Sequence, residues 1–132
     1  MPQDRSSGAA ANRWGRETAR QIASQIGAVM QRRGSNEALL NGQKVVIKSA
    51  APATDSVGVS YKMLETLDAV IGAFQLDDGS FELWSISPQQ FGAAMRETRS
   101  RGPSAGKVAL VRKRVFVSHG KSLGRVRINP PS

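Results

Sequence analysis

An acid and a lysine, Glu37 and Lys48, have a spacing that could bring two chemically useful groups together. They flank Asn41-Gly42, a pair that favours a type I′ turn because both residues accept a positive φ, so the segment predicts a β-hairpin. In a hairpin, both side chains can reach the same end of the sheet. A carboxylate there can hold a divalent metal ion, and a lysine can assist the attack of water on a phosphodiester. The same spacing also fits an ordinary salt bridge between two strands.

The last part of the chain is strongly basic. The sequence carries 19 Lys+Arg against 10 Asp+Glu, a net charge of +9. Residues 1–34 contribute +4 (six bases, two acids), residues 35–98 contribute −4 (four bases, eight acids) and residues 99–132 contribute +9 (nine bases, no acid). A surface of one sign attracts a polyanion, so nucleic acid is the predicted partner. The candidate contacts are Arg99, Arg101, Lys107, Arg112, Lys113 and Arg114.

Other kinds of site are excluded or poorly supported. The chain has no cysteine and one histidine, His119, which excludes disulfides, thiol nucleophiles, and metal sites built from thiolates or from two histidines of one chain. The stretch GPSAGKV at 102–108 is one residue too short for a phosphate-binding P-loop and has Val108 where that loop needs a hydroxyl. We expect His119 in a turn after a strand at 115–117, with little support for a catalytic role.

No membrane segment is expected. No apolar run approaches the roughly 18 residues of a membrane span, and the N-terminal sequence lacks the apolar core of a signal peptide. We therefore expect a cytoplasmic protein.

The apolar pattern then predicts the elements that would position these residues. Residues 13–32 have apolar side chains at helical spacing, ending at Gly34. The hairpin follows, and its second strand is apolar on both faces at 45–47, as in the interior of a sheet. We expect a loop at 49–58 and a short helical turn at 61–67.

A second hairpin and a further helix are expected in the next part of the chain. Strands at 69–74 and 81–86 flank a turn at Asp77-Asp78-Gly79, and Ser87-Pro88 has the form of a helix start. Phe81 and Trp84 should face opposite sides of their strand, and Trp14 should pack from the first helix. After a loop at 97–106, we expect two or three strands to Ile128.

These elements predict an α+β fold: a central mixed β-sheet with an N-terminal helix and a second helix packed on it. We expect a disordered arm at 1–11, one domain at 12–129 and a disordered tail at 130–132. The apolar pattern of 107–128 makes a frayed basic tail the weaker interpretation of the charged end.

The arrangement resembles the PD-(D/E)XK nuclease family, the restriction-endonuclease-like fold. The matching features are the helix 13–32 with Glu17, then Glu37, then Val46-Ile47-Lys48, and the resemblance covers residues 13–96. It implies that Glu37 ligates magnesium (or manganese) together with a backbone carbonyl near Ile47, that Lys48 positions the attacking water, and that Glu17 assists from the helix. Two positions depart from the motif: Glu37 stands in place of Asp, and Val46 stands in place of the (D/E) of (D/E)-x-K.

Three hypotheses for function follow. The first is a magnesium-dependent endonuclease acting on duplex DNA, as a homodimer that reaches both strands. The second is a non-catalytic nucleic-acid-binding module, which the valine at position 46 makes a serious alternative. The third is a small ribosome- or RNA-associated protein.

Overall fold

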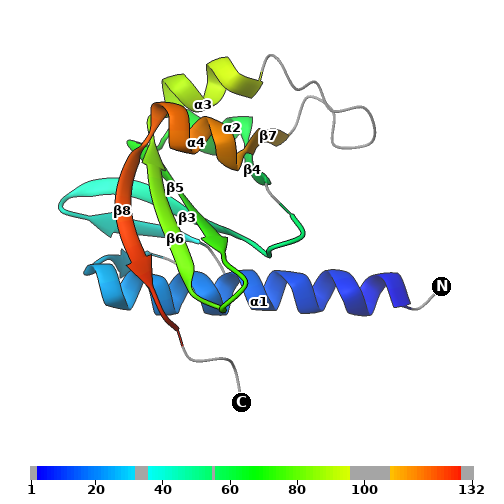
Figure 1. The fold of residues 1–132 in the computed structure, drawn as a ribbon. Coiled ribbons are helices and arrows are strands. Elements are labelled where there is room, and N and C mark those ends of the chain that lie inside the picture. The colour runs from blue at the N-terminus through cyan, green and yellow to red at the C-terminus, as the bar shows by residue number, and fades with distance from the viewer. Residues whose placement is uncertain (1–2, 32–35, 55, 96–107, 129–132) are drawn as a thin grey trace.

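The computed structural model describes residues 3–31, 36–54, 56–95 and 108–128. Its centre is a mixed six-stranded sheet in the order β1-β2-β3-β5-β6-β8, with helices packed on both faces (Figure 1). This confirms the predicted α+β class with a central mixed sheet and an N-terminal helix, whereas a restriction-endonuclease-like core stays a prediction. The elements are α1 (Gln3–Ile26), β1 (Val29–Met30), β2 (Glu37–Leu40), β3 (Gln43–Ala50), β4 (Ser56–Ser60), α2 (Tyr61–Leu64), β5 (Ala69–Gln75), β6 (Phe81–Ile86), α3 (Pro88–Met95), β7 (Val108–Arg112), α4 (Lys113–His119) and β8 (Lys121–Val126).

The hairpin of β2 and β3 forms as predicted. Asn41 and Gly42 both have positive φ, 53° and 80°, as in a two-residue turn whose twist matches that of the flanking strands. The register sets Glu37 opposite Val46. Val45, Val46 and Ile47 are buried, so β3 is an interior strand, as expected from its apolar run.

The connection from β3 to β5 was predicted incorrectly as a loop at 49–58. Strand β3 continues to Ala50, and β4 begins at Ser56. Since β3 and β5 are parallel, the chain must cross over between them, and β4 and α2 make that crossing. β4 pairs with β7 in a separate two-stranded sheet. The alternation of Val57 and Val59, both buried, is the sequence signal of this strand.

The second predicted hairpin is confirmed. β5 and β6 pair antiparallel, and Gly79 takes a φ of +87° in the turn between them. Ser87 begins α3 as expected: its hydroxyl accepts a hydrogen bond from the amide of Gln90 at 3.1 Å. Phe81 and Trp84 lie on opposite faces of β6, as their spacing predicted.

Helix α1 has different bounds from those expected. It begins at Gln3, inside the segment expected as a disordered arm, and alanine, the strongest helix former, occupies positions 9–11. It ends at Ile26, because Gly27 adopts a φ of +80° and the amide of Ala28 donates back to the carbonyl of Ala23. The expected end at Gly34 was therefore wrong. No helix within the described ranges is both long and apolar enough to span a membrane.

The segment after β7 is helical rather than extended, which corrects the expected strand at 115–117. In α4, Phe116 is fully buried against Phe74 and Phe91, with ring centroids 5.3 Å and 6.1 Å away. The helix ends before Gly120, whose amide donates to the carbonyl of Phe116. His119 therefore lies at the end of a helix, and its side chain is exposed.

Two apolar clusters lie on the two faces of the sheet. On one face, Ile22 and neighbouring residues of α1 pack against Val45, Ile47 and Ile71. On the other, the β4–β7 pair, α3 and α4 cover β3, β5 and β6 (Figure 1). We call these the α1 face and the α4 face. Two polar side chains on the strands can therefore act together only if both lie on the α1 face or both lie on the α4 face.

Candidate functional site

Glu37 and Lys48 lie on the same face of the sheet. Glu37 is opposite Val46, and Lys48 follows Val46 by two residues on β3, so all three side chains point to the α4 face. Glu37 and Lys48 are thus diagonal neighbours on adjacent strands. Both are half-buried. A joint chemical role for Glu37 and Lys48 stays a prediction.

Lys48 lies in a poorly hydrated environment. It is in the sheet interior, level with Gly72 on β5 and Trp84 on β6. Burial lowers the pKa of Lys48 below its ordinary value of 10.5, because the charged ammonium is less well solvated there than in water. A lysine of this kind can give up or take a proton more readily than a surface lysine.

Glu17 is not part of this group. It belongs to α1, half-buried, and accepts a hydrogen bond from Arg20 at 2.5 Å. It lines a groove with Trp14 and Phe81, on the α1 face. The sheet therefore separates Glu17 from Glu37 and Lys48. The sequence alone could not show this, because the side of the sheet that each residue faces depends on strand register.

The described residues bring few oxygen ligands for magnesium together. Magnesium prefers several oxygen ligands in near-octahedral geometry. Glu37 faces Val46, which supplies no ligand, and Glu17 lies beyond the sheet. Within residues 3–31, 36–54, 56–95 and 108–128, no three His, Asp or Glu side chains gather where they could hold a metal ion.

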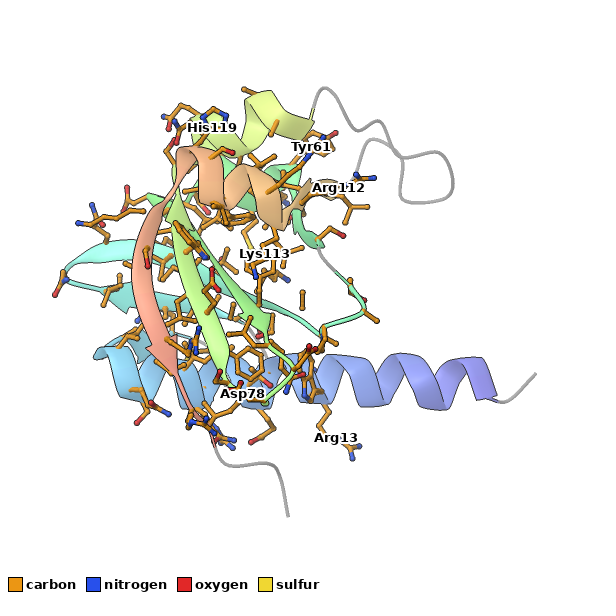
Figure 2. The ribbon with its side chains drawn as sticks, viewed as in Figure 1. Arg13, Tyr61, Asp78, Arg112, Lys113 and His119 are labelled. Atoms are coloured by element: carbon orange, nitrogen blue, oxygen red, sulfur yellow. The ribbon has the colours of Figure 1, made fainter. Side chains whose placement is uncertain are left out.

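The predicted phosphate contacts differ in their environments. Arg112, at the junction of β7 and α4, and Arg114 on α4 have exposed side chains. Lys113 is instead turned toward the sheet: its Nζ lies 3.7 Å from Glu82 Oε2 and 5.7 Å from the centre of the Phe74 ring. Figure 2 shows Arg112 and Lys113 pointing in different directions from the start of α4. Arg99, Arg101 and Lys107 lie outside the described residues.

Two further exposed basic residues follow Arg112 and Arg114 in the chain. Lys121 and Arg125 are exposed on β8, the strand at one edge of the sheet, which follows α4 directly (Figure 1). We call Arg112, Arg114, Lys121 and Arg125 the basic surface. The contacts named from the sequence did not include the two on β8, although Leu123, Val126 and Ile128, which pack on the sheet, mark the inward-facing positions of that segment.

The basic surface has no acid in its own segment. From Val108 to Ile128 the sequence contains no Asp or Glu. The acids that approach this segment are Glu82, which pairs with Lys113, and Asp78, which pairs with Arg127 at 3.2 Å. No ion pair of the described residues involves a member of the basic surface. Arg125 lies opposite Glu82 on β6 and contributes to the lowered pKa of Asp78, so part of its charge is offset by acids of the protein.

The comparisons do not place the chain in a family. No family model matches the sequence, and no curated protein shows significant similarity to it. The resemblance to PD-(D/E)XK nucleases, which depended on Glu17, Glu37 and Val46-Ile47-Lys48, therefore stays a prediction.

Proposed function

We propose that this protein binds nucleic acid through the phosphate backbone, using the basic surface. The observation that carries the proposal is the set of four exposed bases at the end of β7, on α4 and on β8, in a segment without acids. Arginine and lysine hold phosphates by charge and hydrogen bonds, and they release condensed counterions when they do so. Contacts of this kind position a protein on a duplex without reading its sequence.

The edge position of β8 supports the same proposal. Among the described residues, β8 pairs with a strand on one side only, and charges such as those of Lys121 and Arg125 oppose pairing of an edge strand with a second copy. The same exposed bases can reach phosphates. Predictions of a homodimer and of a cytoplasmic location come from the sequence alone and stay predictions.

Two variants of equal net charge test the proposal. Arg112→Gln/Arg114→Gln/Arg125→Gln removes three charges from the basic surface, and Arg16→Gln/Lys44→Gln/Lys62→Gln removes three from elsewhere. Each lowers the net charge from +9 to +6. Fluorescence anisotropy with a labelled DNA duplex should show at least tenfold weaker binding for the first variant and much less for the second. Equal losses would mean that net charge, rather than this surface, governs binding.

Phosphodiester cleavage is a second candidate, favoured by one observation. Lys48, whose pKa is lowered by burial, lies diagonally across from Glu37 on the same face of the sheet. Plasmid should be incubated with wild type, Glu37→Ala and Lys48→Ala in magnesium or manganese. Cleavage lost in both variants, with duplex binding retained, supports this candidate. Unchanged cleavage in both variants rejects these residues as the site.

A further inference from the structure

A groove on the α1 face is lined by different kinds of side chain from the basic surface and from the surroundings of Glu37 and Lys48. It lies between α1, the β5–β6 turn and the end of β8, and has a volume of about 430 Å³. Figure 2 shows Asp78 in that turn, beside α1. The sheet separates the groove from Glu37 and Lys48. Its lining includes Trp14, Glu17, Gln21, Gln75, Asp78 and Arg127.

Trp14 gives the groove an aromatic wall. Its ring is half-buried, with the centroid 6.1 Å from that of Phe81 and the planes tilted by 40°. Phe81 is almost fully buried and packs against the indole of Trp14, which also lines the groove. A flat ligand ring can stack on such a surface, and nucleic-acid-binding proteins use aromatic side chains in this way.

Two carboxylates supply hydrogen-bond acceptors at the groove. Asp78 is fixed in place: its Oδ1 accepts from the amide and the hydroxyl of Ser80, at 2.9 Å and 2.5 Å, and its Oδ2 accepts from Arg127. The Ser80 hydrogen bonds, with smaller contributions from Arg127 and Arg125, lower the pKa of Asp78, so it is ionised near neutral pH. Glu17 pairs with Arg20 through Oε2. A carboxylate has more acceptor positions than these contacts use, so the groove favours a ligand with N–H donors.

One arginine of the groove lining can contact the phosphate of such a ligand. Arg127 lines the groove, and its side chain is 74% exposed although it pairs with Asp78. An aromatic wall, a fixed acceptor and an exposed arginine together match a nucleotide.

We propose that this groove binds an unpaired guanine nucleotide of a nucleic-acid strand. Among the bases, guanine presents two neighbouring N–H donors on its Watson–Crick edge, which match a carboxylate, and its bicyclic ring suits stacking on Trp14. The inference rests on the proposed function for the strand as a whole. The basic surface holds the backbone, and the groove takes one base that is not paired.

The test compares a DNA duplex with the same duplex carrying one unpaired guanine. We expect the extra guanine to tighten binding to wild type about tenfold, the size expected for one stacked and hydrogen-bonded base. Asp78→Asn should lose most of that gain and should alter binding to the plain duplex no more than Asp77→Asn does. Asp77→Asn is the matched control, because Asp77 is exposed in the same turn but does not line the groove. An unpaired thymine should give a smaller gain than guanine.

A second measurement separates failure of the groove from failure of the proposed function. Guanosine monophosphate alone is titrated into the protein while the indole N–H of Trp14 is followed by NMR, with Glu17→Gln as a second variant. A saturable shift that weakens in Glu17→Gln supports the groove even if no duplex binds. If the duplex binds, but neither the unpaired guanine nor the mononucleotide affects the protein, the groove inference is wrong and the basic surface stands. Equal gains in wild type and Asp78→Asn also overturn the inference.

Discussion

Lys48 has a charged side chain although it lies on an interior strand of the sheet. It is half-buried on an interior strand, and burial lowers its pKa from 10.5. Holding a charge in such a place costs folding free energy, because the ammonium loses part of its hydration. A residue that costs stability is a candidate for a functional role, and the cost can be measured.

We predict that Lys48→Met stabilises the protein at neutral pH, by about 1 kcal/mol. In wild type, the unfolded chain keeps its proton up to about the ordinary pKa of 10.5 while the folded chain loses it earlier. The unfolding free energy of wild type should therefore rise as pH increases toward that value, and the advantage of Lys48→Met should shrink. Urea unfolding between about pH 7 and pH 10 measures this. Parallel pH profiles for wild type and Lys48→Met would contradict this prediction. Lys62→Met is the control, because Lys62 is exposed and its replacement should leave the pH profile of wild type unchanged.

Gly72 is needed because two aromatic rings pack on it. A Cβ at this position would lie 2.7 Å from an atom of the Phe74 ring and 2.9 Å from one of the Phe116 ring. Gly72→Ala should therefore destabilise the fold by about 1–3 kcal/mol through overpacking. Gly92→Ala, in α3, has no atom within 4 Å of the new Cβ and should be neutral or stabilising by up to about 1 kcal/mol. Equal melting temperatures for the two variants would exclude the packing argument.

At the scale of elements, α4 shows where local preference fails. Residues 113–119 contain two valines and a phenylalanine, which favour a strand when considered alone. In the fold, the helix places Phe116 between Phe74 and Phe91 and turns Lys113 toward Glu82. The helical conformation of residues 113–119 therefore depends on contacts with residues far away in the sequence, which a local pattern does not reveal.

Phe116→Ala should therefore cost about 3–5 kcal/mol, the usual penalty for emptying an aromatic site in a core. Val117→Ala is the matched control on the same helix, because Val117 is 45% exposed and should change the free energy of unfolding by less than about 1 kcal/mol. Chemical denaturation gives both values. Similar penalties for the two would mean that Phe116 does not anchor α4.

Elements specified by neighbouring residues were predicted correctly, and those specified by distant ones were not. Asn41-Gly42 and the Ser87 cap each act within a few residues, and both formed as expected. The crossover through β4 depends on pairing with β7, which is distant in the chain. The end of α1 at Gly27 was missed, because Val29 and Met30 continue the helical spacing although they belong to a strand.

At the scale of the whole molecule, the sheet decides which candidate residues can act together. Register brings Glu37 and Lys48 to one face of the sheet and sets Glu17 on the other. The charge pattern predicted Arg112 and Arg114 as exposed bases but not the inward turn of Lys113, which needs Glu82 and Phe74. The charge distribution thus predicted that basic side chains would be exposed, and the fold determines which of them are.

The salt dependence of duplex binding tests the basic surface most directly. Four phosphate contacts predict that log K falls with log salt concentration with a slope of about −3.6, since each contact on B-DNA contributes roughly 0.9. Arg112→Gln/Arg114→Gln/Arg125→Gln should reduce the steepness by about 2.7, whereas Arg16→Gln/Lys44→Gln/Lys62→Gln should leave the wild-type slope nearly unchanged. A wild-type slope near zero, or the same slope in both variants, would contradict the account.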